Sequence, residues 1–374
     1  NTMINYAFAG YTLEDLIGKG GDLGVHAAAR AVADKNLLVP GSAKWNSVYE
    51  NAVSNGIDVF GGGAGILDTS QSNSFEVDYN LQDLVDGVDI VVGASYRDYI
   101  LRSNGTLFTD YDAPIEFTDM GLYAQAQTDL MDGALRLTGS MRYDKSEFFE
   151  GTITPRLGAL LFLSENQNIR FSYQTGFQNP AAQDQYIGLD IGQAILMGSS
   201  PDNVDRFNMR LRGGSGNTYN LTGNQVKNNS YTLASVQAGA PVAAGDLGNV
   251  GPQNVKSYEL GYRVNGKKTA FDIGAYYSKW DNFISAVNVI TPLYGSASAV
   301  SGLIALSQGD FKVVSYDANT DEIVNTYGIS AGLETSVLDI FDLNMSYSYN
   351  KMEFDNPNAD FEAGFNTPEN RAVV

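Results

Sequence analysis

Apolar and polar residues alternate with a period of two along most of this chain. Residues 135–143 place Leu, Leu, Met and Tyr on one side and Arg, Thr, Ser and Arg on the other. The same arrangement recurs in residues 75–82, 169–177, 258–264 and 343–350. Because successive side chains of a β-strand point to opposite faces, this period predicts strands with one apolar and one polar face.

The residue types on the two faces distinguish a membrane barrel from a soluble β-sandwich, because both kinds of sheet alternate. The polar positions carry charges and amides, whereas the apolar runs end in Tyr, Phe or Trp. Such a pattern is typical of a lipid-facing band bordered by aromatic girdles around a wet lumen. Residues 114–131 and 268–285 are also longer than a usual soluble strand of about 5–6 residues. The pattern favours the barrel.

Short and long connections alternate along the chain. Asp86-Gly87, Asp132-Gly133 and Asn265-Gly266 mark short turns, and such pairs favour positive φ and tight hairpins. Outer-membrane barrels pair short periplasmic turns with longer extracellular loops. We therefore place the long connections outside the cell. They lie at residues 102–113, 144–150, 179–254, 286–325 and from 354 onward.

Ten strands follow from this pattern, and residues 2–10 are an eleventh candidate. The ten segments are 74–83, 88–101, 114–131, 134–145, 151–163, 168–178, 255–265, 268–285, 325–337 and 342–353. We expect an all-β protein, a partial transmembrane antiparallel β-barrel of about 10–11 strands. An odd number would fit a truncated chain, because single-chain bacterial barrels use even numbers of strands.

Residues 11–73 do not alternate in this way. Residues 22–36 are rich in Ala and predict a short helix, and residues 42–55 predict a second one with Ser42 as a candidate N-cap. By the order of short and long connections, 11–73 is expected to be a helical extracellular loop. Both ends of the chain are interpreted as truncations of a longer protein, since neither a signal peptide nor a closing strand is visible.

Composition removes several classes of function. The 374 residues include no Cys, which excludes disulfides and thiolate ligands or nucleophiles. The formal charge is −20 and Lys and Arg do not cluster, so we expect no nucleic-acid partner. No apolar run approaches the roughly 20 residues that a transmembrane helix requires.

Several short stretches resemble the barrel of TonB-dependent receptors, and they occur in the order found in that family. These are RYDKSEF at 142–148, TPRLG at 154–158, IRFSYQTGFQNP at 169–180, NVKSYELGY at 254–262 and FNTPENR at 365–371. The stretch from Gly24 to Asp34 and the glycine run at 61–63 are similar to versions from Bacteroidetes-type bacteria.

The resemblance implies a parent protein in the cell outer membrane that imports a ligand by TonB-driven transport. Its barrel would have roughly 22 strands around a plug, and this chain would supply about half of them. The chain shows no plug domain, no TonB box and no early barrel strands. The implied partners are outer-membrane lipid, the TonB–ExbB–ExbD complex acting through the missing plug, and a surface lipoprotein or other outer-membrane subunits.

Polar residues on the alternating strands are the first candidates for function. Because the family's lumen is filled, we expect them to line the lumen or to contact the plug through hydrogen bonds and ion pairs. The candidates are Arg97, Gln125, Arg136, Arg142, Arg156, Arg170, Glu259 and Arg263.

The long connections are the candidates for ligand binding, because binding residues concentrate on loops that a rigid scaffold holds in place. Within 179–254 and 286–325, Tyr186, Tyr219 and Tyr294 are plausible contacts, although exposed loop tyrosines are also common without a function.

Catalytic and metal sites have little support. The lone His26 has no Cys or second His at metal-ligand spacing, and no nucleophile elbow surrounds any Ser. Asp317, Asn319 and Asp321 have the opening of a calcium loop but lack its Gly and its final Glu. We favour a solvated hairpin tip there. We expect no cofactor and no enzymatic activity.

Three functions remain open. The first is an importer whose extracellular loops bind a bulky ligand. The second is a barrel without import, serving as a structural subunit of an outer-membrane complex. The third is a secreted all-β adhesin or carbohydrate-binding protein, which would require the apolar faces to be packed against another sheet.

Overall fold

The computed structural model describes residues 23–35, 37–57, 63–81, 85–337, 340–354 and 369–373. The chain divides into two units, Asn1–Gly65 and Ile66–Val374, and each is described by itself. The candidate strand at 2–10 and the residues of the motif at 365–368 lie outside the described residues.

The first unit contains the two predicted helices, α3 (Leu23–Asp34) and α4 (Ala43–Ser54). Helix α4 begins as the sequence predicts, because Ser42 Oγ accepts a hydrogen bond of 3.1 Å from the backbone N–H of Trp45. Among the described residues, no helix is long and apolar enough to cross a membrane. The extracellular placement of this segment stays a prediction.

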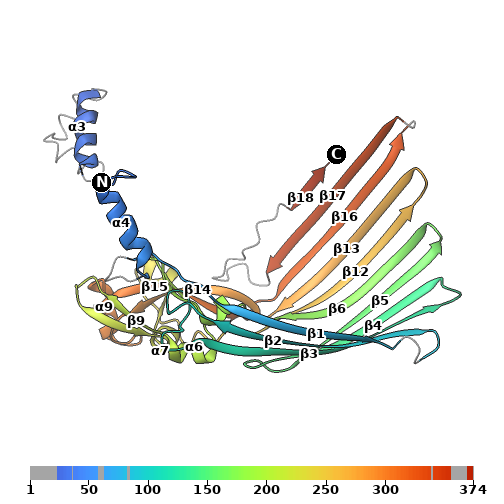
Figure 1. Cartoon of the computed structure of the whole chain (residues 1–374), viewed down its shortest axis with the longest axis horizontal. Coiled ribbons are helices and arrows are strands. Elements are labelled where there is room, and N and C mark those ends of the chain that lie inside the picture. Colours follow the sequence, from blue (N-terminus) through green and yellow to red (C-terminus); the bar gives the residue numbers. More distant parts are fainter. Residues whose placement is uncertain are drawn as a thin grey trace. The chain divides into compact units, whose positions relative to one another are not determined.

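An antiparallel sheet of eleven strands dominates the second unit (Figure 1). Most neighbours in the sheet are also neighbours in sequence, and all pair antiparallel. In the order of the sheet, the strands are β1 (Gln71–Asn80), β2 (Val88–Leu101), β3 (Ile115–Leu130), β4 (Leu135–Ser146), β5 (Thr152–Ser164), β6 (Gln167–Gln178), β12 (Gln253–Asn265), β13 (Thr269–Asp281), β16 (Val324–Val337), β17 (Phe341–Phe354) and β18 (Asn370–Val373). This sheet is called the wall below.

The wall confirms all ten predicted strands within a few residues. Its eleventh described strand is β18, which begins inside the motif at 365–371. Among the described residues the sheet is open, with β1 at one edge and β18 at the other.

Cross-strand register gives the wall two chemically different faces. On one face, Phe75 pairs with Tyr96, Tyr96 pairs with Met120, and Leu157 pairs with Tyr173. This face leaves large apolar side chains uncovered, including Leu260 at 58% exposure. A contiguous apolar surface on that scale in water would be unfavourable, and it is normal for a surface that lies in lipid. This is the predicted lipid-facing band.

The predicted long loops 179–254 and 286–325 contain regular structure, and their extracellular placement stays a prediction. Strands β14 (Phe283–Pro292) and β15 (Phe311–Thr320) flank helix α9 (Val300–Ser307). The predicted strand 268–285 is divided at Asn282, whose φ of 58° is left-handed. Asn tolerates that conformation better than most residues, so the chain turns there from the wall into β14.

These two segments fold together into what is called the outer lobe, residues 179–252 and 283–320. Its main sheet has the order β11–β14–β15–β8–β7, and β9 pairs with β10 beside it. The remaining elements are α5 (Ala182–Tyr186), β7 (Gly188–Asp190), β8 (Ile195–Met197), α6 (Pro201–Arg206), β9 (Asn208–Arg212), β10 (Thr218–Thr222), α7 (Gly223–Asn228), β11 (Tyr231–Thr232) and α8 (Leu233–Gln237).

The buried core of the second unit lies mainly in the outer lobe. One cluster joins Met197, Leu211, Leu221, Val289 and Tyr316, all of them fully buried. A smaller cluster at the lobe's junction with the wall joins Leu101, Phe108, Ile115, Phe117 and Tyr186. Burial of these side chains supplies the main force that folds the lobe, and the second cluster fixes it to strands β2 and β3.

Candidate functional site

The polar face of the wall contains every lumen-facing residue predicted from the sequence. Cross-strand register places all eight on the face opposite the apolar band; they are Arg97, Gln125, Arg136, Arg142, Arg156, Arg170, Glu259 and Arg263. Contact of these residues with a plug stays a prediction. Their shared face follows from the period of two.

Two of these arginines form forked ion pairs with carboxylates on other strands. Arg136 donates to both oxygens of Asp129 at 2.8 and 2.9 Å. Arg170 of β6 donates to both oxygens of Asp272 of β13 at 2.7 and 2.8 Å. The second pair passes over the intervening strand β12, so β12 must have no bulky side chain on its polar face at that point. Forked geometry of this kind fixes the planes of both groups.

A glycine of β12 leaves the space that this pair needs. Gly261 of β12 lies directly beside Arg170 in the register, and a Cβ built on it would lie 2.5 Å from Arg170 Cζ. A Gly inside a strand commonly marks such a close approach. Any larger residue at 261 would therefore force the guanidinium to move from the position in which it forms the fork with Asp272.

At three more places on the polar face, a side chain crosses over a glycine and forms a hydrogen bond with a strand beyond it. The Tyr123 hydroxyl donates to Asp78 over Gly93, and the Tyr276 hydroxyl donates to Asn350 over Gly328 at 2.9 Å. Arg142 donates to Ser95 at 2.8 Å over Gly121. We call these four arrangements the glycine bridges. Each links two strands that are not neighbours, so together they brace the wall from its polar side.

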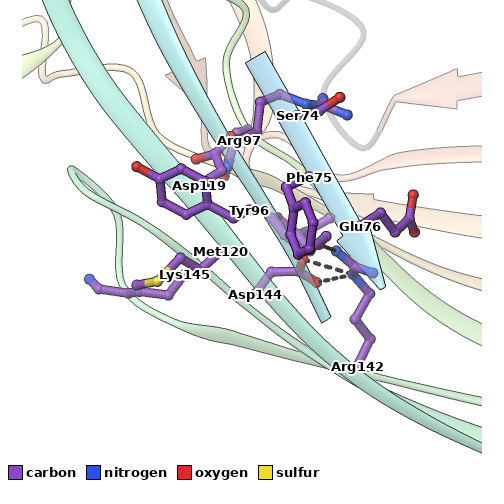
Figure 2. A pocket seen from close by; sticks show the side chains of 13 residues that line it. Ser74, Phe75, Glu76, Tyr96, Arg97, Asp119, Met120, Arg142, Asp144 and Lys145 are labelled. Carbon is purple, nitrogen blue, oxygen red and sulfur yellow. Dashed lines mark hydrogen bonds and ion pairs between the residues drawn. The ribbon is translucent and has the colours of Figure 1, made fainter. Parts of the chain in front are cut away.

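A pocket of about 280 Å³ is lined mainly by residues of β1–β4 (Figure 2). Its polar lining includes Glu76, Arg97, Asp119, Arg142 and Asp144. Figure 2 shows Arg142 joined to Asp144, and the Nε to Oδ1 distance of this pair is 2.7 Å. In contrast, Asp119 Oδ1 is buried and accepts no hydrogen bond from the described residues. A buried acceptor without a donor is unfavourable, so this pocket suits a ligand that donates hydrogen bonds.

The three predicted ligand tyrosines occupy two different places in the outer lobe. Tyr219 and Tyr294 stack with centroids 5.6 Å apart, although 75 residues separate them in the chain. Both side chains are half-buried. Tyr186 is fully buried in the junction cluster, and its hydroxyl donates to Asp202 at 3.1 Å. Burial raises its pKa. Tyr186 therefore presents no surface to a ligand in this structure, and its binding role stays an untested prediction.

Asp310 holds the tyrosine pair in place, although no motif in the sequence points to this residue. The Tyr219 hydroxyl donates to Asp310 Oδ2 at 2.7 Å, and the Ser215 N–H donates to Oδ1 at 2.9 Å. Burial raises the pKa of Asp310, but these hydrogen bonds outweigh it and the pKa is lowered overall. The Tyr294 hydroxyl donates to Gln308 at 2.8 Å. Residues from both halves of the lobe thus build one aromatic surface.

The alternative calcium loop is not formed in this structure. Asp317 and Asn319 lie in strand β15, not in a loop. The Asn319 amide donates to the carbonyl oxygens of Gly251 and Asn282 at 2.9 and 2.7 Å, so it joins the lobe's two segments. The part of the chain that the structure describes contains no cluster of three or more His, Cys, Asp or Glu residues arranged to hold a metal.

Comparison with known families decides what this wall belongs to. Residues 5–374 match the family model described as TonB dependent receptor-like, beta-barrel. The chain belongs to this family. It is a multi-pass β-barrel of the outer membrane, and members of the family are receptors and transporters rather than enzymes.

Solved TonB-dependent receptors have the same fold. The siderophore receptor PirA from Pseudomonas aeruginosa matches with a TM-score of 0.51 and 14% identity, over 78% of this chain and 44% of that one. A mutant of the ferric enterobactin receptor PfeA from the same organism matches with a TM-score of 0.50 and 12% identity, over 76% and 36%. This chain therefore spans less than half the length of these receptors. No curated protein matches it.

Proposed function

We propose that this chain forms part of the barrel of a TonB-dependent transporter that imports a bulky ligand captured by the outer lobe. The observation that carries the proposal is the pairing of an uncovered apolar face with a polar face that retains a buried, unpartnered carboxylate oxygen at Asp119. The first face suits lipid, and the second suits a lumen that another segment fills.

The polar face supports a lumen-filling plug. The glycine bridges keep Arg142 and Arg170 against the wall. Asp119 lines the pocket beside Arg142, and its buried Oδ1 has no donor among the described residues. A backbone N–H or a cationic side chain of a plug would supply the donor that Asp119 lacks. Receptors of this family generally work with TonB–ExbB–ExbD, and we propose the same energy source for this protein.

The outer lobe supports ligand capture. Tyr219 and Tyr294 offer a stacked aromatic surface, and the network around Asp310 fixes its orientation before a ligand arrives. Aromatic side chains provide large contact areas while losing little conformational entropy. A rigid surface of this kind also avoids the ordering cost that weakens binding by loose loops.

The proposal is tested by uptake in cells that produce the full-length receptor with or without TonB. Fluorescently labelled siderophore, cobalamin, oligosaccharide and oligopeptide probes would be offered in turn. We expect TonB-dependent uptake of one class and a loss of at least about tenfold in the Tyr219→Ala/Tyr294→Ala double variant. A Tyr49→Ala variant, in helix α4, is the matched control for loss of tyrosine.

Uptake that is equal with and without TonB, or absent for every class, would contradict import. It would favour the second function, a structural barrel subunit that holds partner proteins through the outer lobe. Normal uptake by the double variant would retain import but remove the tyrosine pair from ligand binding.

A further inference from the structure

Two lysines face each other on the apolar side of the wall. Lys256 of β12 and Lys279 of β13 are direct cross-strand partners (Figure 1 shows the two strands side by side). Both lie near the ends of their strands that connect to the outer lobe, away from the short turn at 266–268. Like charges directly opposite each other destabilise a sheet. A counter-charge placed between the two ammonium groups would relieve this repulsion.

The protein supplies only partial compensation for the two charges. Lys279 Nζ lies 3.8 Å from Asp281 Oδ1, which is a long ion pair. Lys256 is exposed and makes no hydrogen bond or ion pair with any residue in the described ranges. The flanking partners in the same row, Thr175 and Asn325, carry no charge. A positive site thus remains on a chain whose formal charge is −20.

A neighbouring ion pair shows how a lysine on this face is normally balanced. Lys351 Nζ lies 2.5 Å from Glu353 Oε1 on the same strand. That pair lies two strands away on the apolar face and needs no outside counter-charge. Among the described residues, one carboxylate, that of Asp281, lies near Lys256 and Lys279.

A row of tyrosines fixes the depth of the lysine pair in the membrane. Tyr173, Tyr258, Tyr277 and Tyr327 lie side by side in the next row of the sheet. The Tyr277 hydroxyl donates to Asn325 Oδ1 at 2.7 Å and thus points toward the lysine row. On the other side of the tyrosines, Leu260 and Ile329 continue the apolar band. Tyrosines with apolar residues on one side and polar ones on the other mark the membrane–water interface.

We propose that Lys256 and Lys279 together bind the phosphate of an anionic lipid in the outer leaflet. Lysine binds phosphate as a point charge with three donors, and one phosphate between two ammonium groups would remove their repulsion. The headgroup would lie at the lysine row, and its acyl chains would run along Tyr258 and Leu260 in the apolar band. This proposal depends on the family assignment and not on import.

The test is native mass spectrometry of the full-length receptor in detergent, titrated with lipid A. Each lysine near an anionic lipid surface adds to the binding free energy, so removing both should weaken the binding of lipid A roughly twentyfold to thirtyfold. We expect that loss in the Lys256→Gln/Lys279→Gln variant. Lys267→Gln, in the exposed turn at the opposite end of β12, is the control for altered charge and should bind lipid A as the wild type does.

Two further arms identify the group that is bound. Lipid A without its phosphates should bind the wild type as weakly as lipid A binds the double variant. Inorganic phosphate should not compete at concentrations well above that of the lipid. Equal lipid A binding by wild type and double variant would overturn the proposal, as would wild-type binding of the dephosphorylated lipid at full strength. Effective competition by inorganic phosphate would contradict the lipid and show that the site binds a free anion instead. Heat-modified gel mobility checks that each variant is folded.

Discussion

The wall and the outer lobe are stabilised in different ways. The wall buries few side chains, because one face is apolar and uncovered and the other is braced by hydrogen bonds over glycines. The lobe has a conventional core in which Leu211, Val289 and Tyr316 are fully buried. The wall thus depends on lipid and on cross-strand polar contacts, whereas the lobe depends on its own hydrophobic packing.

Truncating a leucine in each region should show the largest difference. Leu211→Ala leaves a cavity in the lobe's core, and such changes destabilise by about 2–5 kcal/mol. Leu260→Ala removes a lipid-facing side chain and should change stability by less than about 1 kcal/mol. Amide hydrogen exchange of β9 and β14 should accelerate in the first variant alone. Equal protection in both would show that the lobe has no independent core.

Glycine substitutions on the polar face test the bracing of the wall. In Gly261→Ala the new Cβ would displace the Arg170 guanidinium, with an expected loss of about 1–3 kcal/mol. Gly332 is the matched control on the same face, because a Cβ there would meet nothing within 4 Å. The temperature at which the folded band disappears in detergent gels should fall only for Gly261→Ala. A similar fall for Gly332→Ala would show that replacing any strand glycine lowers the stability, whether or not a side chain crosses it.

The lobe should also respond to pH, in the direction set by Asp317. Burial, and then the charge of Asp184, raise the pKa of Asp317 to about 7 from 3.8. A carboxyl whose pKa is raised by folding favours the folded state at low pH, and this contribution is lost as pH rises toward 7. The lobe's melting temperature should therefore be higher at pH 5.5 than at pH 8.0. Asp317→Asn should remove most of that difference, and an unchanged difference would exclude Asp317 as its source.

The wall could be predicted from the sequence because the alternation that defines each strand lies within a short stretch of consecutive residues. Alternation sets the faces of each strand, so the shared face of Arg97, Arg142 and Arg263 followed without knowledge of the fold. The glycine bridges also leave a signal in the sequence, because Gly93 and Gly121 interrupt alternating strands at polar positions and so indicate a close approach.

The outer lobe could not be predicted because its contacts are distant in sequence. Strand β8 has three residues, too few to show a period, and it pairs with β15 more than a hundred residues later. The stacking of Tyr219 on Tyr294 depends on that pairing. The long alternating run through residue 285 also concealed the break at Asn282, where a single left-handed residue starts the lobe.

The most direct test of the account uses the absence of Cys from the chain. Single Cys residues at positions 259, 260, 262 and 263 of β12, in the full-length receptor in lipid vesicles, would carry a fluorescent label read with a lipid-soluble and a water-soluble quencher. We predict that labels at Leu260 and Tyr262 are quenched from the lipid, and that labels at Glu259 and Arg263 are not. Equal lipid quenching at all positions, or the opposite alternation, would contradict a wall with one face in the membrane.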